Sequence, residues 1–202
     1  MKSIDGNSFV FSGIGEYWLL KSLQHRLFLQ VRFIPFENTR LTVVSAIAIR
    51  HQNINVQVEA RDGVLNLYVD GRSQNLPTSH TVYIVTNNGI QPLSGLTVAK
   101  LDLSNKTYST NKLLIRANDS NTLYITLPSG ASLRISLQVS FLHITVELSS
   151  QYYYSTSGLL GTFNGNASDD YLSPSGHLLV NVMSISEEEI HTFGLSCEYQ
   201  IS

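Results

Sequence analysis

The chain has 202 residues, of which 43% are hydrophobic and only 14% are charged, and its formal net charge is −2. This length suits one large all-β domain or two small ones, and the apolar content allows a sizeable core and argues against an intrinsically disordered chain. Because the lysines and arginines form no basic stripe, the composition supports neither a nucleic-acid partner nor membrane binding through a polybasic patch.

Targeting signals and the number of cysteines bear on the cellular location of the chain. The first residues lack the apolar run of a signal peptide, and the most apolar stretch, 41–49, is too short to cross a bilayer. We therefore expect any secretion or anchoring signal of the parent protein to lie outside this chain. Cys197 is the one cysteine, so no internal disulfide can form. Taken alone, that count would indicate a cytosolic protein.

Alternation of apolar and polar residues dominates the chain and predicts half-buried strands. The alternating runs cover 54–60, 123–127, 133–139 and 142–148. Turn sequences separate them, in chain order Asp62-Gly63, Asp70-Gly71, Asn87-Asn88-Gly89 and Pro128-Ser129-Gly130. Such turns accept positive φ and are typical of antiparallel hairpins.

A single helix is expected, near the C-terminus. Ser186 followed by Glu189 forms a capping-box pattern, and Ile190 and Phe193 would anchor a short helical turn to a sheet. There is no internal repeat and no linker. We therefore predict one all-β domain over 1–202, an antiparallel β-sandwich of two packed sheets with one short helical segment.

The densest polar cluster is the loop 161–170, which holds two Asn and two Asp within seven residues around a glycine. Calcium prefers six to eight oxygen ligands, and a short loop with alternating oxygens can wrap the ion. The spacing is not that of an EF-hand. On the residues alone, we favour an Asn-Gly turn followed by a solvated acidic loop over a metal site.

The same segment carries a family resemblance. Residues 158–166 read GLLGTFNGN and precede Asp169-Asp170-Tyr171, which resembles the GLCGNFNG…DDF motif of von Willebrand factor type D domains. Asp5-Gly6 with the later GEYWLL at 15–20, VDG at 69–71 with Leu76-Pro77, and the segment 190–196 resemble the opening, middle and closing motifs of the family. The motifs occur in family order over nearly the whole chain.

Within that family the chain resembles a cysteine-poor subgroup. Ser157 and Leu160 stand where the family motif has cysteines. This form is similar to the domain in a membrane mucin that carries an AMOP domain and in sushi-domain-containing cell-surface proteins. In those proteins a Gly-Asp-Pro-His stretch precedes the segment that matches Met1 to Asp5, so the chain is expected to begin just after it.

The resemblance implies a calcium site in which an Asp of the opening motif joins the Asn/Asp loop. The implied ligands are Asp5, Thr162, Asn164, Asn166 (through its carbonyl), Asp169 and Asp170. Thr162 stands where the family often has Asn, and a hydroxyl is a poorer ligand.

The resemblance also implies the function. We expect a non-catalytic, calcium-binding structural or interaction module of a mucin-like or cell-surface adhesion protein, located extracellularly, either secreted or in the ectodomain of a single-pass membrane protein. Its expected partners are neighbouring domains of the parent protein and other cell-surface or matrix proteins, without a disulfide-linked polymer. The alternative is a carbohydrate-active β-sandwich, either a lectin-like binder or a glycosidase.

Local sequence supports neither a zinc site nor an acid/base pair. The six histidines lack zinc-site spacing, and adjacent carboxylates such as Asp169 and Asp170 make a poor acid/base pair. Cys197 is interpreted as a buried filler. Tyr152-Tyr153-Tyr154 is either an exposed aromatic patch for a partner or glycan or, as we favour, a strand with alternating rings on core and surface.

Three Asn-X-Ser/Thr sequons begin at Asn105, Asn118 and Asn166. We predict glycosylation of Asn105 and Asn118, which lie in polar turn regions, and none of Asn166 inside the expected metal loop.

Overall fold

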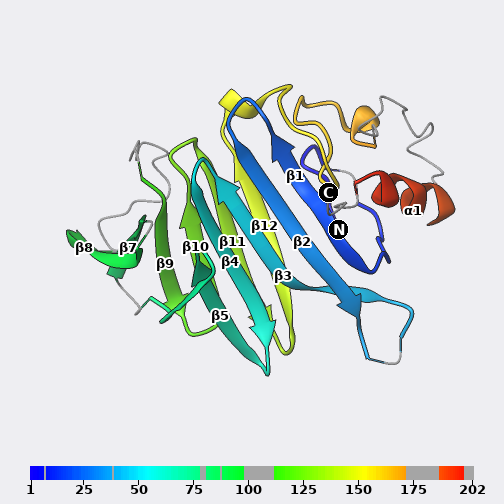
Figure 1. Ribbon diagram of the computed structural model, residues 1–202. Helices are drawn as coiled ribbons and strands as arrows, with labels where there is room; N and C mark the ends of the chain where they lie inside the picture. The colour runs from blue at the N-terminus through cyan, green and yellow to red at the C-terminus, as the bar shows by residue number, and fades with distance from the viewer. Residues whose placement is uncertain are drawn as a thin grey trace. The chain divides into compact units, whose positions relative to one another are not determined.

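The computed structural model describes residues 1–6, 8–37, 39–77, 81–86, 88–97, 112–171 and 187–197 (Figure 1). Its strands are β1 Gly15–Ser22, β2 Leu27–Pro35, β3 Thr42–His51, β4 Ile54–Arg61, β5 Val64–Val69, β6 Arg72–Gln74, β7 Thr81–Thr86, β8 Gly89–Thr97, β9 Leu114–Asp119, β10 Thr122–Thr126, β11 Ala131–Gln138 and β12 Phe141–Leu148. Two 3-10 turns, η2 Ser150–Tyr152 and η3 Ala167–Asp169, and the helix α1 Glu187–Ser196 follow. None of the helices described here has the length and apolarity to cross a membrane.

The strands form two antiparallel sheets, in the orders β1-β2-β3-β4-β5-β6 and β12-β11-β10-β9-β7-β8. This confirms the predicted all-β class with one short helix near the C-terminus. By its internal contacts the chain divides into two compact units, residues 1–52 with 152–202, and residues 53–151. The organisation of residues 1–202 as a single domain stays a prediction.

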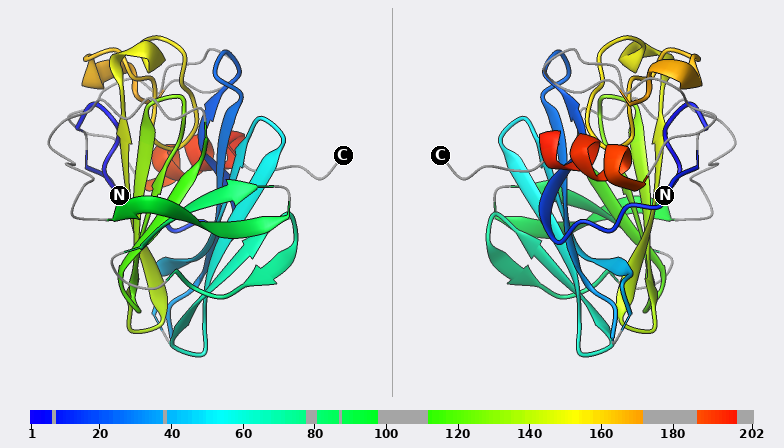
Figure 2. Two further views of the ribbon diagram at one scale, coloured as in Figure 1. Left: turned by 90° about the vertical axis from the view of Figure 1, so that its left-hand side faces the viewer. Right: turned by 90° about the vertical axis from the view of Figure 1, so that its right-hand side faces the viewer.

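The first unit contains β1, β2, β3 and α1. Its core includes an aromatic cluster in which Phe11 meets Tyr17 and Phe33 edge-to-face, with ring centroids 4.9 and 5.1 Å apart. Phe11 also packs against Gly194 of α1, where a Cβ would collide with its ring. The helix therefore lies close to the N-terminal segment (Figure 2). Phe193 is buried as predicted, whereas the proposed cap Ser186 lies outside the described residues.

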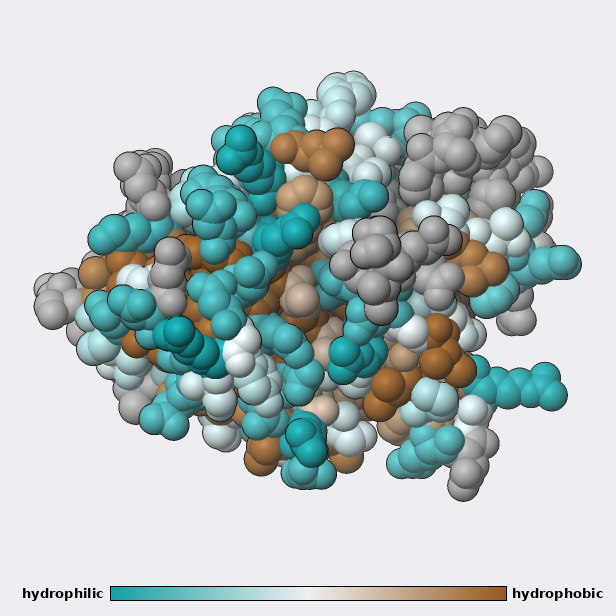
Figure 3. All heavy atoms as spheres, viewed as in Figure 1, coloured by the Kyte–Doolittle hydropathy of each residue, from teal (hydrophilic) through white to brown (hydrophobic). Residues whose placement is uncertain are grey.

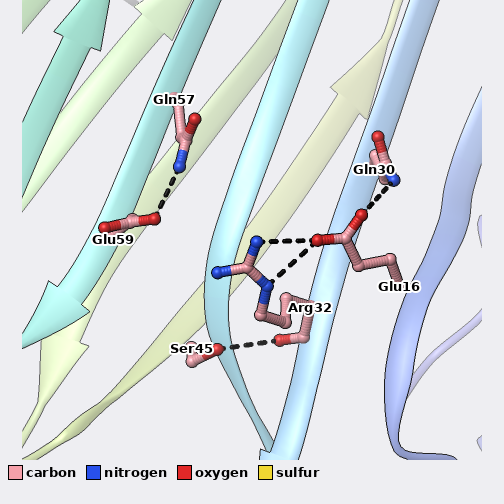
Figure 4. A network of polar contacts seen from close by, with 6 residues as sticks. All are labelled: Glu16, Gln30, Arg32, Ser45, Gln57 and Glu59. Carbon is pink, nitrogen blue, oxygen red and sulfur yellow. Dashed lines mark hydrogen bonds and ion pairs between the residues drawn. The ribbon is translucent and has the colours of Figure 1, made fainter. Parts of the chain in front are cut away.

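The opposite face of β1 and β2 carries a polar row. Glu16 is paired with Arg32 in register, and its Oε1 accepts hydrogen bonds of 3.0 and 2.7 Å from that guanidinium (Figure 4). Its Oε2 accepts a further bond of 2.9 Å from Gln30. Because the pair is half-exposed, it contributes modestly to stability and mainly fixes cross-strand register.

Next to this row the surface becomes apolar. Ile14 and Ile34 are 62% and 38% exposed, and Leu41 is 54% exposed. Figure 3 shows apolar side chains gathered near the end of β2 and its hairpin to β3. The strand face thus changes from charged to apolar along its length.

The second unit consists of hairpins. β4 and β5 are joined at Asp62-Gly63, and β5 and β6 at Asp70-Gly71, all four residues having positive φ. These turns confirm the predicted hairpins. Val139 joins β11 to β12 with φ of 57° and is 89% exposed. His143 is exposed on β12. Of the predicted turn 87–89, Asn87 lies outside the described residues.

Candidate metal site

The loop 158–171 is positioned by β1. The amide of Leu159 donates to the carbonyl of Trp18 (2.9 Å), and the amide of Leu160 donates to that of Leu19 (3.0 Å). The carbonyl of Leu160 accepts in turn from Ile4 (2.8 Å). The loop is therefore held between a core strand and the N-terminal segment, and residues from the two ends of the sequence come together in the first unit.

Asp5 is bound by the loop backbone. Its Oδ2 accepts the amides of Asn164 (3.0 Å) and Gly165 (2.9 Å). The structure thus brings together the opening-motif aspartate and the Asn/Asp loop, as the resemblance implied. Two converging amides place partial positive charge against this carboxylate.

The two asparagines shape the loop. The Oδ1 of Asn164 accepts the amide of Asn166 (2.8 Å), while its Nδ2 donates to Oδ2 of Asp169 (2.7 Å). Asn166 caps η3, since its Oδ1 accepts both the amide (3.2 Å) and the hydroxyl (2.7 Å) of Ser168. Both side chains thus support the loop. The backbone carbonyl of Asn166, which accepts the amide of Asp169 (3.4 Å), is the candidate ligand atom of this residue.

Asp170 is the most buried carboxylate of the site, with 1% of its surface exposed. Its Oδ2 accepts the hydroxyl of Ser3 (2.5 Å), and its Oδ1 has no hydrogen-bond partner among the described residues. Burial, and to a smaller extent the nearby charges of Asp5 and Asp169, raise the pKa of Asp170 to about 6, against a lowering by the Ser3 bond.

A second carboxylate oxygen is also buried without a described hydrogen-bond partner. The Oδ1 of Asp169 is buried and receives no hydrogen bond from any residue that the structure describes. Buried acceptors without partners are rare because each forfeits its hydration. Two such oxygens on adjacent residues therefore fit the hard-oxygen chemistry that a calcium ion requires.

The fit is incomplete in one respect. Within the described ranges, no three His, Cys, Asp or Glu side chains gather as a group that could hold a metal ion. Thr162 is half-buried. Among the described residues, none of the other expected ligands is hydrogen-bonded to its hydroxyl. The donor chemistry and the two unpartnered oxygens match a cation, whereas the three carboxylates stay dispersed.

Two residues of the site were not predicted. Ser3 is the donor to Asp170, and the buried Thr156 accepts the amide of Phe163 (2.7 Å) and donates to the carbonyl of Gly161 (3.2 Å). A single hydroxyl residue leaves no local pattern in a sequence. Only the pairing of distant segments reveals these two roles.

The fold and the loop together define the class: an all-β module with an oxygen-rich acidic loop fastened to its N-terminal segment. The family model of the von Willebrand factor type D domain matches residues 87–177, which confirms the family that the motifs predict. This family is a structural and interaction module and not an enzyme family.

Individual relatives agree with this match. The chain is 29% identical over 200 residues to human Sushi domain-containing protein 2, a match that covers 95% of this chain and 21% of the relative. It is 45% identical over 56 residues to mouse Otogelin-like protein and 43% identical over 56 residues to its human counterpart, covering 28% of this chain and 2% of each relative. The chain thus spans about a fifth or less of the length of these relatives.

Proposed function

We propose that this chain is a non-catalytic extracellular module of a mucin-like or cell-surface adhesion protein, and that one calcium ion stabilises its fold. The match to the von Willebrand factor type D family and the similarity to Sushi domain-containing protein 2 support an extracellular or cell-surface setting. Its partners are neighbouring domains of the parent protein and other cell-surface or matrix proteins.

The observation that carries the calcium proposal is the pair of buried, unpartnered Oδ1 atoms on Asp169 and Asp170. A bound calcium ion supplies two positive charges that offset the desolvation of these carboxylates. Asp5, Asn164, Asp169 and Asp170 would hold the ion through their side chains and Asn166 through its carbonyl, and the amide of Asn164 also orients Asp169. Thr162 is a further, weaker candidate ligand.

The role of such an ion would be structural. Asp5 and the loop are separated by about 160 positions, and already meet through the hydrogen bonds to Asn164 and Gly165. With a single cysteine, the chain has no internal disulfide to restrain its unfolded state. An ion that binds only the folded state stabilises it by about 2.7 kcal/mol at one hundred times its dissociation constant.

The test is thermal unfolding in calcium and in EGTA. For a chain of this size, calcium at that excess is expected to raise the unfolding midpoint by roughly 5–10 °C. Asp170→Asn and Asp5→Asn should each lose most of the rise, because each removes a charged ligand while keeping the side-chain shape. Asp62→Asn is the matched control, since Asp62 lies in the exposed β4–β5 turn.

A wild-type midpoint that is the same in calcium and in EGTA would contradict the calcium proposal. Equal calcium responses in wild type and Asp170→Asn would show that the ion binds elsewhere.

A further inference from the structure

Two tyrosines beside the metal loop expose their rings. Tyr153 is 44% and Tyr154 77% exposed, whereas Tyr152 is fully buried. The strand interpretation of this triplet is therefore wrong: Tyr152 ends η2, and the next two residues form a turn. A ring as exposed as that of Tyr154 adds little to the core, so packing does not explain its presence.

The backbone of Tyr154 is strained. Its φ is +57°, a conformation that bulky residues avoid and that glycine or asparagine adopts at lower cost. The amide of Tyr154 donates to the carbonyl of Phe163 (2.8 Å), which fixes the turn. The chain thus holds an aromatic ring outward at a position suited to another residue.

The two rings form a preorganised surface with Phe163, which we name the tyrosine platform (Tyr153, Tyr154 and Phe163). Tyr153 stacks on Phe163, with centroids 4.4 Å apart and planes inclined by 35°. The rings of Tyr153 and Tyr154 are 6.0 Å apart. The hydroxyl of Tyr153 lies 3.8 Å from the point that a Cβ on Gly165 would occupy, so the platform adjoins the loop.

The surroundings of the platform decide which partner it fits. The exposed residues of the adjoining loop are Gly165, Asn166 and Ser168, which supply amide, hydroxyl and backbone groups instead of apolar ones. No Lys or Arg occurs between 152 and 171, whereas the adjoining loop contains the carboxylates of Asp169 and Asp170 and binds that of Asp5 through the amides of Asn164 and Gly165. Protein-binding hot spots lie in desolvated, closely packed surroundings, which this rim does not provide. The carboxylates disfavour an anionic ligand.

We propose that the tyrosine platform binds neutral glycans. The electron-rich face of an aromatic ring attracts the C–H groups on one face of a pyranose, while amide and hydroxyl groups of the loop bond to the sugar hydroxyls. This inference goes beyond the structural role proposed above. The platform is held by ring stacking and a backbone hydrogen bond, so its test is separate from calcium binding.

The experiment is saturation-transfer-difference NMR with three neutral oligosaccharides, N-acetyllactosamine, chitotriose and mannotriose, and with 3′-sialyl-N-acetyllactosamine as the anionic comparison. Wild type, Tyr154→Asn and Val139→Asn are produced in bacteria, because Tyr154→Asn creates an Asn-X-Thr sequon with Thr156, and each is measured in calcium and in EGTA. Val139 is the matched control: it is also exposed and has the same φ of 57°, but lies in the β11–β12 turn. Each substitution relieves backbone strain and should raise the unfolding midpoint.

We expect saturation transfer from wild type and Val139→Asn to at least one neutral oligosaccharide, and affinity reduced roughly tenfold or more in Tyr154→Asn, equivalent to about 1.4 kcal/mol. Because Tyr154→Asn is expected to fold more stably than wild type, lost binding cannot be attributed to unfolding. The proposal is overturned if no neutral oligosaccharide receives saturation, or if Tyr154→Asn binds as wild type does.

A protein partner is distinguished with immobilised gastric mucin before and after periodate, which cleaves the vicinal diols of its sugars. Binding that periodate abolishes supports glycan recognition. Binding that survives periodate yet is lost in Tyr154→Asn assigns the platform to a protein surface and overturns the proposal. If the unfolding midpoint is the same in calcium and in EGTA while glycan binding is retained, only the calcium proposal is contradicted.

Discussion

The hydroxyl of Ser3 donates a 2.5 Å hydrogen bond to Oδ2 of Asp170, joining residues that are 167 positions apart. Both residues are buried, so this bond is shielded from water. It satisfies one oxygen of the carboxylate and leaves the other without a described donor. The N-terminal segment therefore stabilises one of the two oxygens of the charged Asp170 carboxylate. Because the other oxygen has no described donor, this carboxylate is the group of the site most sensitive to protons and cations.

Without calcium, the ionisation of Asp170 should destabilise the folded domain. Burial first, and then the charges of Asp5 and Asp169, raise its pKa from 3.8 to about 6. As the pH rises above 3.8 the unfolded chain loses its proton first, so the contribution of this group to stability falls until the pH passes about 6. The loss is on the order of 3 kcal/mol. In urea titrations with EGTA, the free energy of unfolding of Asp170→Asn should therefore increase relative to that of wild type between pH 4 and pH 7.

Calcium should reverse this trend for wild type alone, since protons and calcium compete for the same carboxylate. The calcium-induced gain in unfolding free energy should be larger at pH 7 than at pH 5. A stability difference between wild type and Asp170→Asn that stays constant from pH 4 to pH 7 in EGTA would refute the raised pKa.

Gly161→Ala should destabilise the domain more than a comparable change elsewhere. Gly161 has φ of +83°, and a Cβ there would lie 2.7 Å from Cβ and 2.8 Å from Cα of Asp170. Backbone strain costs about 1–2 kcal/mol, and the steric conflict adds about 1–3 kcal/mol. Gly71→Ala is the control, because its φ is +76° with nothing within 4 Å of the added carbon.

Chemical denaturation of the two glycine variants separates these contributions. Gly71→Ala should show the strain cost alone. If the two variants lose equal stability, the close approach of Asp170 to Gly161 is not a feature of the folded protein.

Glycosylation should distinguish the three sequons when the chain is secreted from animal cells. We expect occupancy at Asn118, on β9, and at Asn105, which lies outside the described residues. Asn166 should stay unmodified, because its Oδ1 holds the amide and hydroxyl of Ser168 and its backbone belongs to the proposed metal loop. Peptide mapping by mass spectrometry measures each site. Full occupancy of Asn166 would also argue against the calcium site.

The sequence predicted the regular parts of this protein better than its irregular ones. Alternation located β4, β10, β11 and β12, because strand side chains repeat every two residues, and the Asp-Gly pairs located two hairpin turns. Two-residue alternation does not hold for Tyr152–Tyr154, because a short 3-10 turn buries one ring and exposes the next two. The roles of the Ser3 and Thr156 hydroxyls could not be predicted, because they depend on contacts between distant segments and not on neighbouring residues.

Cys197 should be unreactive in the folded protein and should not link two chains. The residue is 1% exposed, and its backbone carbonyl accepts the amide of Trp18 (2.9 Å), which fastens the end of α1 to β1. Burial raises its pKa to about 11, against smaller lowering effects of Ser196 and Lys21, so the reactive thiolate is scarce at neutral pH. Ellman's reagent should therefore react slowly with native protein and fully once guanidinium unfolds it. A non-reducing gel should show a monomer, and a covalent dimer as the main species would mean that Cys197 is accessible in the native state.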